Sequence, residues 1–164
     1  MIFSLRTFTI VHVVLSLVGI GSGVVVLYGL LTRKRLDRWT ALFLASTVAT
    51  SVTGFGFPFD HLLPSHVVGI ISLLVLAVAI VARYALHLNG AWGRLYVITA
   101  MVALYLNVFV LVVQLFQKVP TLNALAPTQS EPAFVLAQLA VLALFVALTA
   151  AAAIRFRNAP VGIA

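Results

Sequence analysis

The segment GFGFPFDHLLPSH carries one of the chain's three acidic residues and two of its four histidines. Imidazole and carboxylate groups bind divalent metals, so Asp60, His61 and His66 could join His12 or Glu131 in a metal site. The spacing within the segment does not favour such a site, because adjacent residues point apart on a regular element and a proline interrupts HLLPSH. We therefore take His66 as the candidate site residue of this segment.

A b-type haem is a second chemistry that the histidines permit. It needs two histidines on facing helices, or one histidine and an open position. We expect His12 and His66 on different helices within about 7 Å of the same depth, so the pair could hold a haem near one membrane face. A second haem is not expected, because His87 lies ~31 Å along the helix from His66. The chain has no cysteine, which excludes iron–sulfur clusters, thiolate metal sites and disulfides.

Apolar helices must position these residues. Of the 164 residues, 63% are apolar and 8% are charged, and the mean hydropathy is +1.21. This composition predicts an all-α integral membrane protein with a single domain. The net charge of +7 comes from basic residues at the ends of apolar runs. In that position they determine topology, and we do not expect nucleic-acid binding.

Five stretches are long enough to cross a hydrocarbon layer of roughly 30 Å as helices. The predicted bundle of five transmembrane helices has spans at residues 8–31, 39–57, 67–88, 95–117 and 134–154. Prolines separate the second span from the third and the fourth from the fifth, and an Asn-Gly turn separates the third from the fourth. We expect the first span to be a retained helix rather than a secretory signal, because its apolar run continues to the basic stop TRKRLDR.

Basic residues near the span ends orient the chain. Arg6 and Lys118 lie on one side, whereas the other side carries eight: Arg33, Lys34, Arg35, Arg38, Arg83, Arg94, Arg155 and Arg157. The positive-inside rule therefore places the N-terminus outside and the C-terminus in the cytoplasm, in the inner membrane of a bacterium. We interpret Arg83 and His87, one turn apart, as a snorkelling arginine and an interfacial histidine.

With this topology, polar residues from all five predicted helices meet near the outer face. His12 and Gln138 lie about 7 Å below the boundary at a 1.5 Å rise per residue. Asn107 lies near mid-membrane, where an unpaired amide costs on the order of a few kcal/mol, so it needs Ser16, Thr50 or a bound ligand as its partner. We predict an outward-facing ligand-binding pocket lined by His12, His66, Asn107, Gln114 and Gln138.

Three predicted helices also carry polar or small-residue faces. On the first helix, His12, Ser16, Gly19 and Gly23 recur at helical spacing, as do Ala100, Ala103, Asn107 and Gln114 on the fourth. Such faces let helices approach closely. The second helix carries Ser46, Thr47, Thr50, Ser51 and Thr53. These hydroxyl groups either bond to their own helix backbone or line a hydrated crevice, and the sequence is compatible with both.

Residues 66–97 carry HVVG at the start of one helix, then ARY, and then GAWGRLYV at the start of the next. This pattern resembles a group of uncharacterised bacterial multi-helix inner-membrane proteins with His-x-x-Gly and Gly-Arg-x-Tyr helix starts. The resemblance implies a helical bundle. In that group a His-Arg pair precedes the Gly-Arg-x-Tyr motif, whereas Trp92 and Gly93 stand there in this chain, so a haem or metal role would lack a ligand.

The sequence favours a binding function. A quinone-like or other lipid-like ligand would suit a pocket of His, Gln and Asn beneath Phe55, Phe57 and Phe59, although these phenylalanines also match an aromatic belt at the interface. The alternatives are an accessory subunit or homo-oligomer in a larger membrane complex, and a small membrane redox enzyme. The spans contain no carboxylate pair, no lysine and no phosphate-binding loop, so we expect no hydrolase, di-iron or retinal chemistry.

Overall fold

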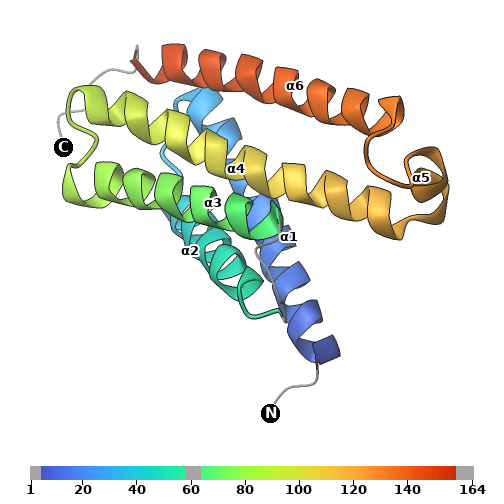
Figure 1. The fold of residues 1–164 in the computed structure, drawn as a ribbon. Helices are drawn as coiled ribbons and strands as arrows, with labels where there is room; N and C mark the ends of the chain where they lie inside the picture. Colours follow the sequence, from blue (N-terminus) through green and yellow to red (C-terminus); the bar gives the residue numbers. More distant parts are fainter. Residues whose placement is uncertain (1–4, 58–63, 158–164) are drawn as a thin grey trace.

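The computed structural model describes residues 5–57 and 64–157, and within them the chain is helical and has no strand. Its α-helices are α1 Leu5–Thr32, α2 Asp37–Gly54, α3 Pro64–Ile80, α4 Ala91–Lys118, α5 Pro120–Leu125 and α6 Pro132–Arg157 (Figure 1). A π-helical turn, η1 Val81–Ala85, continues α3. The prediction of an all-α fold is confirmed for this part of the chain.

Within the described residues, four helical segments are long and apolar enough to cross a membrane, namely Leu5–Thr32, Ser65–Ala85, Ala91–Lys118 and Pro132–Phe156. α2 is not among them, although the sequence predicts a span at 39–57. It begins with Asp37 and Arg38 and carries a run of hydroxyl side chains, and these polar groups lower its hydropathy. The count of five spans therefore stays a prediction.

α4 forms the centre of the bundle. It contributes Tyr96, Val97, Ala100 and Leu104 to the core, and each is no more than 2% exposed. α3 and α6 lie alongside α4, whereas α1 and α2 pair with each other and cross α4 obliquely (Figure 1). In the most apolar stretch of α4, 44% is buried inside the protein, whereas in the most apolar stretch of α6 the buried share is only 11%. α6 therefore packs at the edge of the bundle.

Glycines in α1 determine how closely α2 and α4 approach it. A Cβ atom at Gly23 would lie 2.5 Å from Leu104 Cδ1 and 3.0 Å from the Phe43 ring. A Cβ atom at Gly19 would lie 3.0 Å from Asn107 Nδ2. The small-residue face predicted on the first helix thus packs within this chain, at positions where a methyl group would crowd its neighbours.

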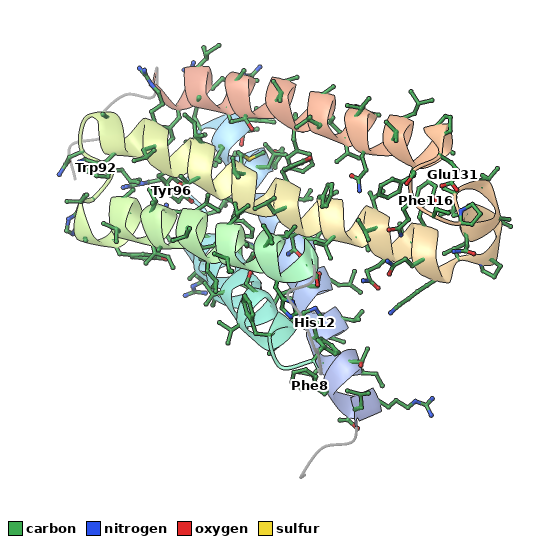
Figure 2. All side chains as sticks on the ribbon, viewed as in Figure 1. Phe8, His12, Trp92, Tyr96, Phe116 and Glu131 are labelled. Carbon is green, nitrogen blue, oxygen red and sulfur yellow. The ribbon has the colours of Figure 1, made fainter. Side chains whose placement is uncertain are left out.

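Exposed tryptophan and tyrosine side chains gather at the end of the bundle where α1 and η1 finish and α2 and α4 begin. They are Tyr28, Trp39, Tyr84 and Trp92. Figure 2 shows Trp92 at this end and Phe116 and Glu131 at the opposite one. Because such side chains favour the membrane–water interface, this end has the composition of an interfacial belt.

We expect Gly23→Ala to destabilise the protein by ~1–3 kcal/mol, because the added methyl group overlaps Leu104 and Phe43. Gly21→Ala is the matched control, since a Cβ atom at Gly21 would have no atom within 4 Å apart from the neighbouring backbone of α1. Thermal unfolding in detergent, followed by circular dichroism, compares the two variants. Equal unfolding temperatures would contradict this packing of α1.

Candidate functional site

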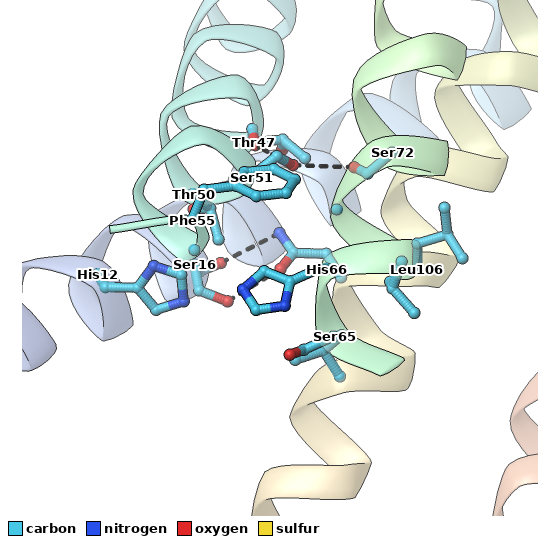
Figure 3. A pocket seen from close by; sticks show the side chains of 15 residues that line it. His12, Ser16, Thr47, Thr50, Ser51, Phe55, Ser65, His66, Ser72 and Leu106 are labelled. Atoms are coloured by element: carbon cyan, nitrogen blue, oxygen red, sulfur yellow. Dashed lines mark hydrogen bonds between the residues drawn. The ribbon is translucent and has the colours of Figure 1, made fainter. Parts of the chain in front are cut away.

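A hollow lined by polar side chains, which we call the polar chamber, lies where α1, α2, α3 and α4 meet (Figure 3). Its volume is about 100 Å³. One water molecule needs roughly 10–15 Å³, so the polar chamber can hold several waters or a small polar group. It is lined by His12, Ser16, Thr47, Thr50, Ser51, Gly54, Phe55, Ser65, His66, Val68, Gly69, Ser72, Leu106, Asn107 and Val110.

Asn107 links α4 to α1 at the wall of the polar chamber. Ser16 Oγ donates a hydrogen bond to Asn107 Oδ1 at 2.9 Å, and Asn107 Nδ2 donates to the Ser16 carbonyl oxygen at 3.5 Å. The prediction that this buried amide requires a partner is confirmed, and the partner is Ser16. An asparagine amide carries two N–H donors, so one of them remains for a molecule in the polar chamber.

Most hydroxyl groups of α2 bond to the backbone of their own helix. Ser46, Thr50, Ser51 and Thr53 each donate to the carbonyl four residues earlier, at 2.7–2.9 Å. Ser51 Oγ also lies 3.0 Å from Ser72 Oγ and so links α2 to α3. Thr50 and Ser51 nevertheless line the polar chamber, so backbone bonding and the lining of a hollow occur on the same helix.

Thr47 departs from this pattern. Its side chain is 1% exposed, and its Oγ1 has no hydrogen-bond partner among the described residues. Leaving a buried hydroxyl group unpaired costs about 1–3 kcal/mol. Thr47 lines the polar chamber, and its Oγ1 lies close to α1, where a Cβ atom at Gly19 would be 3.0 Å away.

The hydrogen bonds of Thr53 assign the tautomer of His12. Thr53 Oγ1 donates its single proton to the Ala49 carbonyl at 2.7 Å, so it can only accept from His12 Nδ1, which lies 2.8 Å away. With Thr53 donating to its own helix, neutral His12 is assigned the tautomer that carries its proton on Nδ1. Its Nε2 lone pair is left to accept a hydrogen bond or to bind a metal.

His66 approaches the polar chamber from α3 and is 4% exposed. Its ring stacks on Phe55, with ring centroids 5.5 Å apart and an interplanar angle of 28°. A Cβ atom at Gly69 would lie 3.1 Å from Phe55 Cζ, so the glycine makes room for this ring. Figure 3 shows the imidazoles of His12 and His66 on facing helices.

Of the five residues predicted to line one pocket, His12, His66 and Asn107 do so, whereas Gln114 and Gln138 do not. Gln138 Nε2 instead donates to the Phe109 carbonyl at 3.2 Å, which fastens α6 to α4. The pocket predicted from five helices is thus formed by four, without α6. Depth along each helix was the basis of the prediction, and depth alone ignores the oblique crossing of α1 over α4 (Figure 1).

The polar chamber bears directly on the predicted cofactors. Its volume is well below the roughly 300–1,000 Å³ of sites for drug-sized ligands, so a haem macrocycle does not fit between His12 and His66 as the helices are packed. In the described part of the chain, no group of three or more His, Asp or Glu residues could hold a metal. Asp60 and His61 lie outside the described residues. A metal bound by His12 and His66 stays a prediction.

Several residues of the polar chamber were not among those predicted. Ser65, Gly69 and Ser72 lie on one face of α3, at spacings of four and three residues. The same spacing identified the small-residue face of the first helix, so it could have identified this one.

Comparison with known proteins gives no relative: a scan of protein-family models found no match, and neither did searches of curated proteins and of solved structures. His66 lies in the first turn of α3, and Gly93 and Arg94 lie in the first turn of α4. These positions agree with the helix starts of the bacterial multi-helix proteins that the sequence resembles. The resemblance itself stays an expectation.

We expect a double-mutant cycle of Ser16→Ala and Asn107→Ala to give a coupling energy of about 0.5–1.5 kcal/mol, as for other hydrogen bonds between membrane helices. Thr149→Ala is the control partner for Asn107→Ala, because its hydroxyl bonds to the Phe145 carbonyl of its own helix. Unfolding in mixed detergent micelles provides the free energies. Additive effects of Ser16→Ala and Asn107→Ala would contradict the link between α1 and α4.

Proposed function

We propose that the protein binds, in the polar chamber, a small molecule or the polar head of a lipid-soluble molecule that carries hydroxyl or carbonyl oxygens. The observation that carries the proposal is Thr47, which lines the hollow and whose buried hydroxyl group has no partner among the described residues. An unpaired buried hydroxyl group destabilises the free protein by about 1–3 kcal/mol. A ligand that bonds to it would remove this penalty.

The donors and acceptors of the polar chamber indicate the ligand class. His12 Nε2 can accept from a ligand hydroxyl, and the Thr47 hydroxyl and the second N–H of Asn107 can donate to a ligand oxygen. Leu106 and Val110 add an apolar wall from α4. A quinol or quinone ring combines such oxygens with an apolar body, so it is the ligand that we favour. A haem would require the helices to separate.

Binding explains the polar chamber better than catalysis does. The described lining residues include two imidazoles but no carboxylate, lysine or arginine, so a general acid–base pair would have to be formed by His12 and His66. A membrane redox enzyme would in addition need a second redox centre. We therefore infer a binding protein, with a redox enzyme as the weaker alternative.

An accessory subunit is the other function that the sequence permits. The small-residue face of α1 was its main support, and in the structure Gly19 and Gly23 pack against residues of the same chain. The exposed apolar faces of α1 and α6 are equally suited to lipid. Ligand binding is therefore the stronger proposal. A chain that binds no ligand but copurifies with a defined partner would favour the accessory subunit instead.

We further propose that α2 is a fifth span, with the N-terminus outside and the C-terminus in the cytoplasm of a bacterial inner membrane. α2 has 18 residues, which gives a helix of about 27 Å, close to the hydrocarbon thickness. Its polar face is covered by the other helices of the polar chamber rather than by lipid. The eight-to-two distribution of basic residues supports this orientation.

We expect Thr47→Val to weaken binding of a short-chain quinol about tenfold, the effect of one buried hydrogen bond, without lowering the unfolding temperature. The substitution keeps the shape of the side chain and removes a group that has no partner in the protein. Thr149→Val on α6 is the control and should leave binding unchanged. Isothermal titration calorimetry in detergent measures both, and wild-type protein that binds neither quinol nor quinone would contradict the favoured ligand.

Single cysteines test the topology, because the chain has none of its own. Lys34→Cys precedes α2, and Ser65→Cys follows it, and both positions are exposed. A maleimide that cannot cross membranes should label position 65 from outside intact cells and position 34 only in inverted vesicles. Labelling of both positions from the same side would show that α2 does not cross the membrane.

A further inference from the structure

A second hollow, of about 190 Å³, lies at the end of the bundle opposite the polar chamber. It is lined by Arg35, Asp37, Arg83, Tyr84, His87 and Leu88, and we call it the basic pocket. These residues come from the α1–α2 connection, the start of α2, η1 and the turn before α4. The basic pocket is thus built where two connections and the helices beside them meet.

The backbone after α3 forms one wall of the basic pocket. η1 widens the last turn, and the Leu86 N–H donates to the Val81 carbonyl at 3.0 Å. His87 and Leu88 then adopt positive φ angles of 51° and 60°, which non-glycine residues rarely do. The Leu88 N–H closes the turn on the Ala82 carbonyl at 2.9 Å. This turn places His87 beside Arg83 and Tyr84 in the wall of the pocket.

Arg83 is held in place by contacts on three sides. Its guanidinium lies 5.3 Å from the centre of the Tyr96 ring and 5.7 Å from that of Tyr84, and it forms an ion pair with Asp37. Its side chain is only 13% exposed, whereas that of Asp37 is 70% exposed. The bond to Asp37 uses Nη2, and a guanidinium has five N–H donors, so others remain for a second anion.

The charge around the basic pocket is strongly positive. Asp37 is the one acidic residue that the sequence places at this end, against the eight Lys and Arg residues counted there. The exposed belt of Tyr28, Trp39, Tyr84 and Trp92 lies at the same end, so the basic pocket is at the level of lipid headgroups if the apolar helices cross a bilayer. Basic pockets between helices at this level suit phosphate groups.

We propose that the basic pocket is a binding site for a phosphate ester, in which Arg35 and Arg83 supply the positive charge and His87 and the Tyr84 hydroxyl supply further donors. The volume exceeds the space of a single water many times over, so it admits a phosphate together with its ester oxygens. The phosphate can belong to an anionic phospholipid of the same membrane or to a soluble phosphorylated molecule, because both present the same oxygens.

Calorimetry or native mass spectrometry of the full chain in neutral detergent tests this proposal with three probes. They are dioctanoyl phosphatidylglycerol, inorganic phosphate and dioctanoyl phosphatidylcholine. We expect Arg35→Gln to weaken binding of the anionic probes by about fivefold or more, as for the loss of a charge-assisted contact. Arg38→Gln is the matched control, since it removes the same charge from an exposed residue that does not line the basic pocket.

The outcomes separate the two sources of phosphate. Binding of phosphatidylglycerol alone, weakened only by Arg35→Gln, identifies a lipid site, and equally tight binding of inorganic phosphate identifies a soluble ligand. Equal losses of affinity for the anionic probes in Arg35→Gln and Arg38→Gln would overturn the proposal, because the probes would then be attracted by the net positive charge of this end rather than by the basic pocket. Failure of both anionic probes to bind, or equal binding of phosphatidylcholine, would overturn it too. Arg35 is exposed, and the ion pair in the pocket joins Arg83 to Asp37, so substituting Arg35 leaves that ion pair in place.

Discussion

A polar group on a helix that hydrocarbon surrounds has to find its partner inside the protein, and this requirement organises the bundle. Asn107 sits in the central helix, and its side chain bonds to Ser16 on α1. Apart from Thr47, the hydroxyl groups of the α2 residues that line the polar chamber bond to their own backbone and, at Ser51, also to α3. The bonds of Asn107 with Ser16 and of Ser51 with Ser72 each join two helices, and these four helices are the ones that enclose the polar chamber.

Close approach of the helices makes these bonds possible. Gly19 and Gly23 let α1 lie against α2 and α4, and Gly69 lets α3 accept the Phe55 ring. The polar chamber persists between them because more than half of its lining residues are small hydroxyl residues or glycines, which leave space that larger apolar side chains would fill. The hydroxyl groups of Thr47, Thr50 and Ser51, which together with Asp37 and Arg38 lower the hydropathy of α2, therefore belong to residues that line the polar chamber.

The sequence predicts the helices well, since long apolar runs bounded by charges, prolines or an Asn-Gly turn have few alternatives to helix. Depth along the helices places His12 and His66 in one layer, and in the structure both line the polar chamber together with Asn107. It fails for Gln114 and Gln138, because the crossing angle of α1 over α4 depends on contacts such as Gly23 with Leu104. Thr47 could not be distinguished from its neighbours, since all α2 hydroxyls look alike until their surroundings are known.

The shallow packing of α6 bears on the order in which the chain assembles. Synthesis proceeds from the N-terminus, so α1 to α4 are made before α6. Every described residue of the polar chamber and of the basic pocket belongs to that earlier part. α6 then packs against α4 and α1, and its bonds to them include Gln138 with the Phe109 carbonyl and Arg155 with the Leu31 carbonyl. Both sites are therefore encoded in a segment that can form before the last helix leaves the ribosome.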